Sequence, residues 1–305
     1  MDARAAKVIE GMVCRESAIV NRFFDTNQNR IGAYRMINSD RWEAEDAIRS
    51  LQRACLKRVN ESEVDHVLAI QDTSELNFSN LSGRLDADDP DLGPTFHDSS
   101  LGFLLHPTLV VDARDGVPLG FSFVREWNRS REDGNKRERE YQKKSLKDKE
   151  SYRWVESAVE SGKLLPAGVK KTIIADRESD VYDAIAGIMA SGCELVIRSS
   201  SDRRLSGEEV RLRDKMKSLP HEYTYMLKIK GNHSRKSREA LMELRYGKVN
   251  LERPHSADPG APGNIPVNCV HVIEKGESTP PNESPVEWRL LTTHPVDTVE
   301  QAMQV

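Results

Sequence analysis

Two aspartates stand at the ends of short apolar runs that are typical of buried strands. Asp72 closes the run 64–71, and Asp176 closes the run Thr172–Ala175. If the two strands are neighbours and parallel, both carboxylates meet at one sheet edge. Such a pair repels itself unless a cation lies between, and hard oxygen ligands suit Mg²⁺ or Mn²⁺. The sequence therefore predicts a divalent-metal site for phosphodiester chemistry, with ions assisting the attacking and leaving oxygens.

Other interpretations of single residues stay open at this point. Asp176 precedes Ser179 and Asp180, so it also suits a turn or helix cap. His106 lies inside a predicted strand and is interpreted as a core histidine, and Trp288 taken alone is also typical of a core. The phosphate-loop, dinucleotide, zinc-protease and serine-hydrolase motifs are absent.

Composition sets broad limits on the class of protein. The 305 residues are 37% hydrophobic and 31% charged, with a net charge of −4, which is typical of a polar globular chain. No apolar run approaches the length of a membrane span, and the first residues lack a leader pattern. The four cysteines contain no C-x-x-C pair, so we expect reduced, mostly buried thiols. These features predict a cytoplasmic protein without a membrane partner.

One segment departs from the acidic average. Between Lys228 and Arg253 there are eight Lys or Arg residues against three Glu. A charged segment of this kind is most often a solvated face, but it is also typical of a surface that contacts nucleic-acid phosphates. On the second interpretation, the candidate contacts are Lys230, Arg235 and Lys236.

The periodicity of apolar residues predicts a helical start followed by a mixed α/β region. A helix capped by Asp40 and Glu43 is expected to run through Cys55. Three strands around an Asp115-Gly116 turn should form a meander, and the whole order is β-β-β-α-β-α-β. Beyond Ser199, alternating stretches predict an antiparallel β insertion. The expected elements are strands 64–73, 102–111, 119–124, 172–176 and 195–198, helices near 154–159 and 181–189, and insertion strands 223–229 and 267–273.

An ordered set of short motifs resembles the IS4-type cut-and-paste DDE transposases across nearly the whole chain. Each motif is weak alone, but their order and spacing are specific. The motifs are Gly32-Ala33-Tyr34-Arg35, Ile70-Gln71-Asp72-Thr73-Ser74, Ala175-Asp176-Arg177-Glu178-Ser179-Asp180, Val196-Ile197-Arg198-Ser199 and Trp288-Arg289-Leu290-Leu291-Thr292-Thr293.

This resemblance implies a ribonuclease-H-like mixed sheet with a long antiparallel β insertion and a helical N-terminal region. The expected domains are a DNA-end-binding region at 1–60, a catalytic core at 61–200, the insertion at 201–294 and the start of the remaining core at 295–305. The resemblance also implies Mg²⁺ as the metal cofactor, which Mn²⁺ can replace. The implied partners are transposon-end DNA and target DNA. The full-length members of the family form homodimers. The resemblance also implies a bacterial-type cytoplasmic protein that is associated with the nucleoid.

Residue roles follow from the same resemblance. Asp72 and Asp176 correspond to the first and second metal-binding carboxylates of the family. Trp288 is similar to a tryptophan that stacks an extruded base, and Arg198 to an arginine that contacts the bound end. Three further basic positions match the end-recognition region by analogy only: Arg4, Lys7 and Arg35.

The family's third carboxylate is a Glu in a Y-x₂-R-x₃-E-x₆-K pattern, and no Tyr in this chain has that spacing. By the family's distances the pattern would lie beyond Val305. We therefore expect a fragment that also lacks part of the end-binding region and the dimerisation helices, and that is catalytically incomplete. Two alternatives remain: a non-catalytic DNA-binding or transposition-interfering protein, and an unrelated two-carboxylate hydrolase, which the lack of sugar-binding aromatics near Asp72 and Asp176 disfavours.

Overall fold

The computed structural model describes residues 3–17, 19–39, 41, 43–81, 83–86, 89–97, 99–129, 146–231 and 235–305. The chain forms two compact units, Met1–Ser50 and Leu51–Val305. Each is described by itself below.

The first unit is helical, with α1 (Ala3–Cys14), α2 (Val20–Phe23), α3 (Asn27–Ile37) and the beginning of α4 (Ala44–Glu61). The three short helices share a small core of Val8, Val20, Phe23 and Ala33. Thr26 caps α3, because its Oγ1 accepts a hydrogen bond from the Asn29 N–H at 3.3 Å.

Helix α4 begins at Ala44, and its first turn is organised differently from the predicted cap. The predicted cap residue, Asp40, lies outside the described residues. The Asp46 carboxylate instead accepts the Glu43 N–H at 3.2 Å. In the second unit, Cys55 and Val59 of α4 are buried in a cluster with Val67 and Val110.

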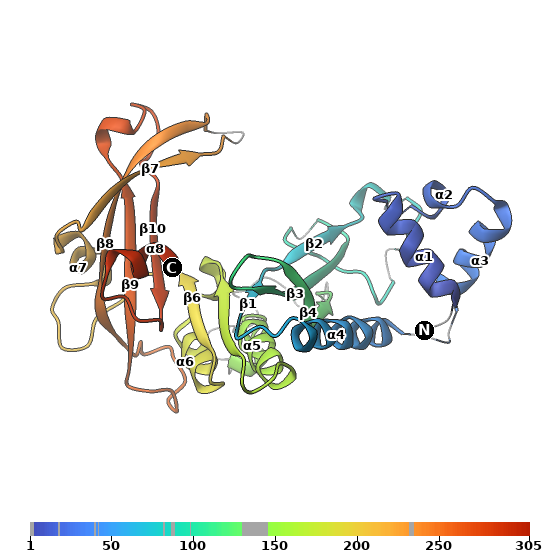
Figure 1. Cartoon of the computed structure of the whole chain (residues 1–305), viewed down its shortest axis with the longest axis horizontal. Helices are drawn as coiled ribbons and strands as arrows, with labels where there is room; N and C mark the ends of the chain where they lie inside the picture. Colours follow the sequence, from blue (N-terminus) through green and yellow to red (C-terminus); the bar gives the residue numbers. More distant parts are fainter. Residues whose placement is uncertain are drawn as a thin grey trace. The chain divides into compact units, whose positions relative to one another are not determined.

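A ten-stranded mixed sheet dominates the second unit (Figure 1). Its strand order is β2-β3-β1-β5-β6-β10-β9-β8-β7, with β4 paired to β3. The strands are β1 (His66–Gln71), β2 (Ser74–Asn77), β3 (Gly102–Asp112), β4 (Pro118–Trp127), β5 (Lys170–Ala175), β6 (Glu194–Arg198), β7 (Tyr223–Ile229), β8 (Arg238–Glu252), β9 (Asn264–Glu274) and β10 (Glu287–Thr292).

Strands β1, β5 and β6 form the parallel centre of this sheet, and all other pairings are antiparallel. The predicted α/β class with a mixed sheet is therefore confirmed. The predicted meander is present as β1, β3 and β4, and Gly116 adopts a φ of +75° at the β3–β4 turn. The short strand β2, which pairs with β3, was not predicted.

Helices cover one face of the parallel strands. Helix α5 (Tyr152–Leu164) packs on β1, β3 and β4, while α6 (Tyr182–Ala190) packs on β6 and on α5 (Figure 1). Ile173 of β5, Leu195 of β6 and Trp154 of α5 are almost fully buried in this layer. Side chains alternate along a strand, so Ile70 and Ile174 point to the opposite face, where Ile70 is 36% exposed.

The antiparallel half of the sheet has a core on each face. Helix α7 (Leu212–Ser218) and the second half of β8 join the core that contains α5 and α6, through Leu212, Met216 and Leu251. On the other face, α8 (Val299–Gln304) joins Met242, Leu244 and Val270. Strand β8 occupies much of the basic segment that was interpreted as a solvated face or a DNA contact.

The cysteines are reduced and mostly buried, as their spacing predicts. All four cysteines are free, and Cys55, Cys193 and Cys269 are buried while Cys14 is exposed. Burial in an apolar core raises the pKa of Cys55 to about 11 and that of Cys269 to about 12.

Candidate functional site

Asp72 and Asp176 follow neighbouring parallel strands at matching positions. Ile70 of β1 pairs directly with Ile174 of β5, and each aspartate comes two residues after its isoleucine. Continued one position past the end of each strand, the alternation of side chains would put both carboxylates on the face opposite α5 and α6. Neighbouring strands lie about 4.8 Å apart, and each aspartate is the first residue beyond the end of its strand.

Both carboxylates are exposed, and each uses one oxygen to fix its own orientation. Asp72 Oδ1 accepts the Thr73 N–H at 2.8 Å. Asp176 Oδ1 accepts the Glu178 N–H at 2.8 Å, which caps the 3-10 turn Arg177–Ser179. The cap alternative for Asp176 is thus realised. Within the part of the chain that the structure describes, neither Oδ2 atom has a protein hydrogen-bond partner, so one oxygen of each carboxylate remains to bind a ligand.

The donor chemistry fits a hard divalent cation such as Mg²⁺, because both ligands are carboxylate oxygens. Among the described residues, however, no group of three or more His, Cys, Asp or Glu side chains could hold a metal ion. The site therefore supplies two of the ligands that such an ion would need.

Arg198 and Trp288 lie on one face of the sheet, the face opposite α5 and α6. Ala175 pairs with Ile197, and Arg198 then ends β6 while Asp176 is the first residue after β5. Arg198 is exposed and pairs with Leu290 of β10. Trp288 lies two residues before Leu290 in β10, so it shares this face. Its indole is half-buried against the core around Val270 and Val272, which agrees with the core interpretation of this residue.

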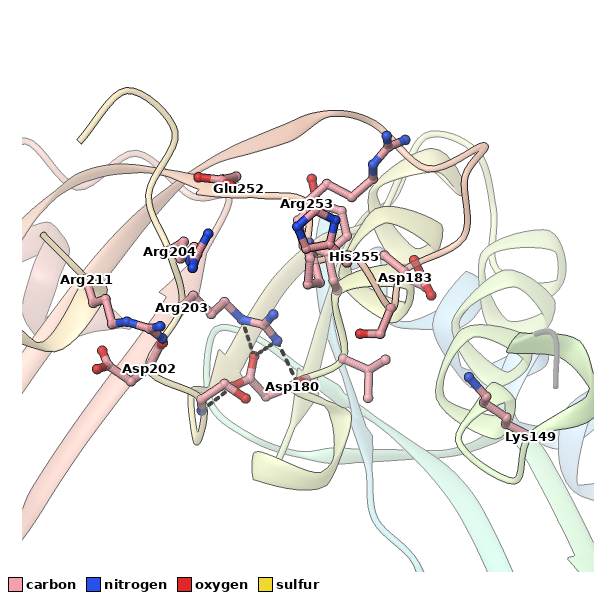
Figure 2. A pocket seen from close by; sticks show the side chains of 16 residues that line it. Lys149, Asp180, Asp183, Asp202, Arg203, Arg204, Arg211, Glu252, Arg253 and His255 are labelled. Carbon is pink, nitrogen blue, oxygen red and sulfur yellow. Dashed lines mark hydrogen bonds and ion pairs between the residues drawn. The ribbon is translucent and has the colours of Figure 1, made fainter. Parts of the chain in front are cut away.

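Asp180 ties the turn after β5 to the loop after β6. Its side chain is fully buried. Oδ2 accepts the N–H groups of Ser200 and Ser201 at 2.7 and 2.8 Å, and Oδ1 accepts Arg203 Nε at 3.0 Å (Figure 2). The loop that follows Arg198 is therefore held against the turn that follows Asp176. Asp180 ends the motif 175–180, but no local sequence pattern indicates this structural role.

A hollow of about 770 Å³ opens beside this loop, next to the first residues of α6 (Figure 2). It is lined by five cationic side chains and four carboxylates, so its formal charge is nearly balanced. Arg203 is held by Asp180, whereas Arg253 NH1 donates to the backbone carbonyls of Pro259 and Ala261. The ten site residues predicted from the sequence are not among its lining residues. The charged lining residues are Lys149, Arg203, Arg204, Arg211, Arg253, Asp180, Asp183, Asp202 and Glu252.

His106 lies beneath the turn that carries Asp72. It is fully buried on β3, with Nδ1 2.9 Å from Thr73 Oγ1 and its ring edge-on to Trp154 at 4.6 Å. Burial, and then the positive charges of Arg153 and Arg125, lower the pKa of His106 to about 3. The core interpretation of His106 agrees with this burial, but only Nδ1 is hydrogen-bonded, and Nε2 has no partner among the described residues.

The basic segment divides into a paired part and an exposed tip. Arg238 binds Glu274, Arg245 binds Glu243, and Lys248 lies 3.1 Å from Asp297. At the tip of the β7–β8 hairpin, Lys230 and Lys236 are exposed, and Arg235 NH2 donates to the Lys230 carbonyl at 3.2 Å. In the sheet order, β6, β10 and β9 separate this hairpin from β5, so the structure does not bring the tip together with Asp176.

The remaining predicted contacts belong to the first unit. Lys7 of α1 and Arg35 of α3 are both exposed, and α1 packs on α3. Arg4 lies in α1, and its side chain is outside the described residues.

No protein-family model matches the sequence. None of the described helices has both the length and the apolar composition needed to cross a bilayer.

Proposed function

We propose that this chain is a DNA transposase of the DDE class, resembling the IS4-type enzymes and among them most closely the Tn5-like ones. The observation that carries the proposal is the register of β1 and β5, which puts Asp72 and Asp176 at matching ends of adjacent parallel strands. Two exposed carboxylates in that relation suit a divalent cation and the cleavage of phosphodiesters.

The arrangement of the sheet supports the proposal. Parallel strands β1, β5 and β6, joined to the antiparallel β3 and β4 and covered by α5 and α6, are compatible with a ribonuclease-H-like core. In this proposal β7, β8 and β9 belong to the antiparallel insertion of the family. The N-terminal helices would recognise transposon-end DNA, with Arg4, Lys7 and Arg35 as contacts.

The proposed reaction is in-line attack on a phosphodiester, first by water and then by a DNA 3′-hydroxyl on target DNA. Asp72 and Asp176 would hold Mg²⁺, or Mn²⁺ in its place. When bound, the ion supplies Lewis-acid activation and stabilises charge on the leaving oxygen. Arg198, the exposed last residue of β6, would bind a backbone phosphate. Trp288 would stack on a base. This stacking requires that one face of its half-buried indole ring is accessible.

The alternative is a non-catalytic DNA-binding or transposition-interfering protein. One observation favours it: within the described residues, no third carboxylate joins Asp72 and Asp176 to complete a metal site. The exposed Lys230 and Lys236 could hold DNA without any cleavage. In the proposal, the full enzyme of this family acts as a homodimer in the bacterial cytoplasm, on nucleoid DNA.

Metal binding and DNA binding, measured on the same preparation, test the proposal. Mn²⁺ binding is followed by electron paramagnetic resonance for the wild type, Asp72→Asn and Asp176→Asn. Asp214→Asn, an exposed change of the same charge on α7, is the matched control. We expect both site variants to lose Mn²⁺ binding and the control to keep it, while all four chains shift duplex DNA in a gel. Equal Mn²⁺ binding by the wild type and Asp72→Asn would refute the metal site.

A DNA shift without Mn²⁺ binding would leave the non-catalytic alternative as the better description. Mn²⁺ binding without a DNA shift would instead favour a metal-dependent enzyme that acts on another substrate.

A further inference from the structure

Arg153, near the start of α5, carries a nearly buried guanidinium that donates hydrogen bonds to Thr73, Glu178 and Glu150, among the residues that the structure describes. Its side chain is 9% exposed. Nε donates to Thr73 Oγ1 at 2.9 Å, NH2 donates to Glu178 Oε2 at 2.9 Å, and NH1 donates to the Glu150 carbonyl at 3.0 Å. One side chain thus connects the turn after β1, the turn after β5 and the residues that lead into α5.

The two side chains that it binds belong to the residues that orient the candidate carboxylates. Thr73 donates its backbone N–H to Asp72 Oδ1, and Glu178 donates its backbone N–H to Asp176 Oδ1, each at 2.8 Å. Each aspartate is therefore linked to the same guanidinium through one intermediate residue.

We infer that Arg153 is a positioning residue of the Asp72–Asp176 site, which holds the two metal-binding turns at a fixed separation. The inference rests on the proposed function, because it assigns a role in the metal site proposed there. Arg153 does not act as a ligand itself. Its guanidinium plane gives two divergent N–H directions, one for each turn, which a single ammonium group does not reproduce.

The surroundings of Arg153 keep its guanidinium in place. The centre of the guanidinium lies 5.6 Å from the Trp127 ring and 5.2 Å from the Trp154 ring. Thr73 Oγ1, which accepts from Arg153, also lies 2.9 Å from His106 Nδ1. A guanidinium only donates, which fits a Thr73 hydroxyl that accepts from Arg153 and donates its own hydrogen to a neutral His106. The hydrogen bonds that connect Arg153 to Asp72 through Thr73 are therefore also connected to the buried His106.

This position predicts how changes at Arg153 affect metal binding. Residues that hold a metal ligand without touching the metal typically alter affinity by about 10- to 100-fold when they are changed. Arg153→Lys keeps the charge but can serve only one of the two turns, so we expect about a tenfold loss of Mn²⁺ affinity. Glu178→Gln and Thr73→Val each release one turn and should have smaller effects.

The matched control is Arg125→Lys. Arg125 lies 5.7 Å from the same Trp127 ring, but its guanidinium pairs with Glu156 at 2.6 Å and not with Thr73 or Glu178. This substitution makes the same chemical change beside the same indole. It should leave Mn²⁺ affinity unchanged.

The test uses the intact chain and two readouts. Mn²⁺ affinity is measured by electron paramagnetic resonance, and thermal unfolding without metal confirms that each variant is folded. If Arg153 acts through both turns, the effects of Arg153→Lys and Glu178→Gln should not add. Introducing Glu178→Gln into the Arg153→Lys chain should then lower the Mn²⁺ affinity by a smaller factor than introducing it into the wild type. Wild-type affinity in a folded Arg153→Lys chain, with binding abolished in Asp72→Asn, would overturn the inference and leave the proposed function standing.

Amide hydrogen exchange of Thr73 and Glu178 provides the second readout, which does not depend on metal. We expect Arg153→Lys to speed exchange at both amides, and Arg125→Lys at neither. Unchanged exchange at both amides in Arg153→Lys would overturn the inference, even if the wild type binds no Mn²⁺ and the proposed function fails.

Discussion

Ile70 and Ile174 are directly paired in neighbouring parallel strands, and each is followed two residues later by an exposed aspartate. The shared register brings two negative charges to one edge of the sheet. No other carboxylate, histidine or cysteine within the described residues joins them to form a metal-binding group. The consequence for reactivity can be tested directly.

We expect this chain to leave supercoiled plasmid DNA uncut in Mn²⁺. Two carboxylates can recruit an ion, but the described residues supply no third ligand, and without one the charge on the leaving oxygen is poorly stabilised. The comparison is a chain extended past Val305 by a helix with the Y-x₂-R-x₃-E-x₆-K pattern, assayed for nicked circles. Nicking by the unextended chain that disappears in Asp176→Asn would show that an acid already present, such as Glu287 or Glu300, is the third ligand.

The exposed tip of the β7–β8 hairpin should contribute to DNA binding through charge alone. Replacing Lys230, Arg235 and Lys236 with Ala should weaken binding to all duplex sequences alike. Each lost phosphate contact should reduce the slope of log affinity against log salt by about 0.9. The slope is measured by fluorescence anisotropy, with Lys163→Ala on α5 as the control. An unchanged slope would show that these residues do not contact phosphates and would favour the interpretation of the segment as a solvated face.

Arg238 and Glu274 form a two-point ion pair whose loss should destabilise the second unit. Arg238 Nε and NH2 donate to the two Glu274 oxygens at 2.9 and 2.8 Å, and the Glu274 side chain is fully buried. Glu274→Gln removes one of the two carboxylates that pair with Arg238 and leaves it only Glu283, so urea unfolding should show a loss of about 2 kcal/mol. Glu160→Gln, which breaks an exposed pair with Lys163, should cost less than about 1 kcal/mol. Equal effects would contradict this account.

His106 should make the folded chain sensitive to acid. Its pKa falls from 6.5 to about 3 on folding, so between these values the unfolded chain binds the extra proton. Above pH 6.5 His106 is neutral in both states and causes no pH dependence. As the pH drops below 6.5, protonation of His106 in the unfolded chain lowers the free energy of unfolding, by up to about 1.4 kcal/mol per pH unit. His106→Gln should unfold with a shallower pH dependence between pH 6.5 and 4, measured by urea denaturation. The exposed His97→Gln should follow the wild type.

The parallel centre could be predicted because its signals are local. The apolar runs ahead of Asp72 and Asp176 are short and continuous, as expected of strands buried on both faces. The predicted helix near 154–159 falls within α5, and the one near 181–189 matches α6 to within one residue at each end, because their apolar stripes have a simple helical period.

Strand β8 was not predicted because its buried side chains point to one face of the sheet in its first half and to the other face in its second half. Ala240, Met242 and Leu244 are buried in the core that contains α8, whereas Val249 and Leu251 are buried in the core that contains α5. The buried positions switch from even to odd numbers, so neither half gives a long period-two pattern. The interleaved charges then make the segment look like a solvated surface.

Arg153 could not be found from local patterns because its contacts are distant along the chain. Thr73 is 80 positions away and Glu178 is 25 positions away. A lone Arg at the start of a helix has no signal that distinguishes a buried guanidinium from a solvated one. Only the tertiary arrangement of β1, β5 and α5 gives it a role.

The register that aligns the two aspartates also affects how the chain folds. Leu68 pairs with Thr172, 104 positions later. On a ribosome that adds 5–20 residues per second, β1 waits about 5–20 s for this parallel partner after it has been synthesised. Pairings across so long a loop have a high contact order and form slowly. During that interval β1 depends on β3, its nearer antiparallel neighbour, to cover one of its edges, and the other edge stays open to chaperones or to a second nascent chain.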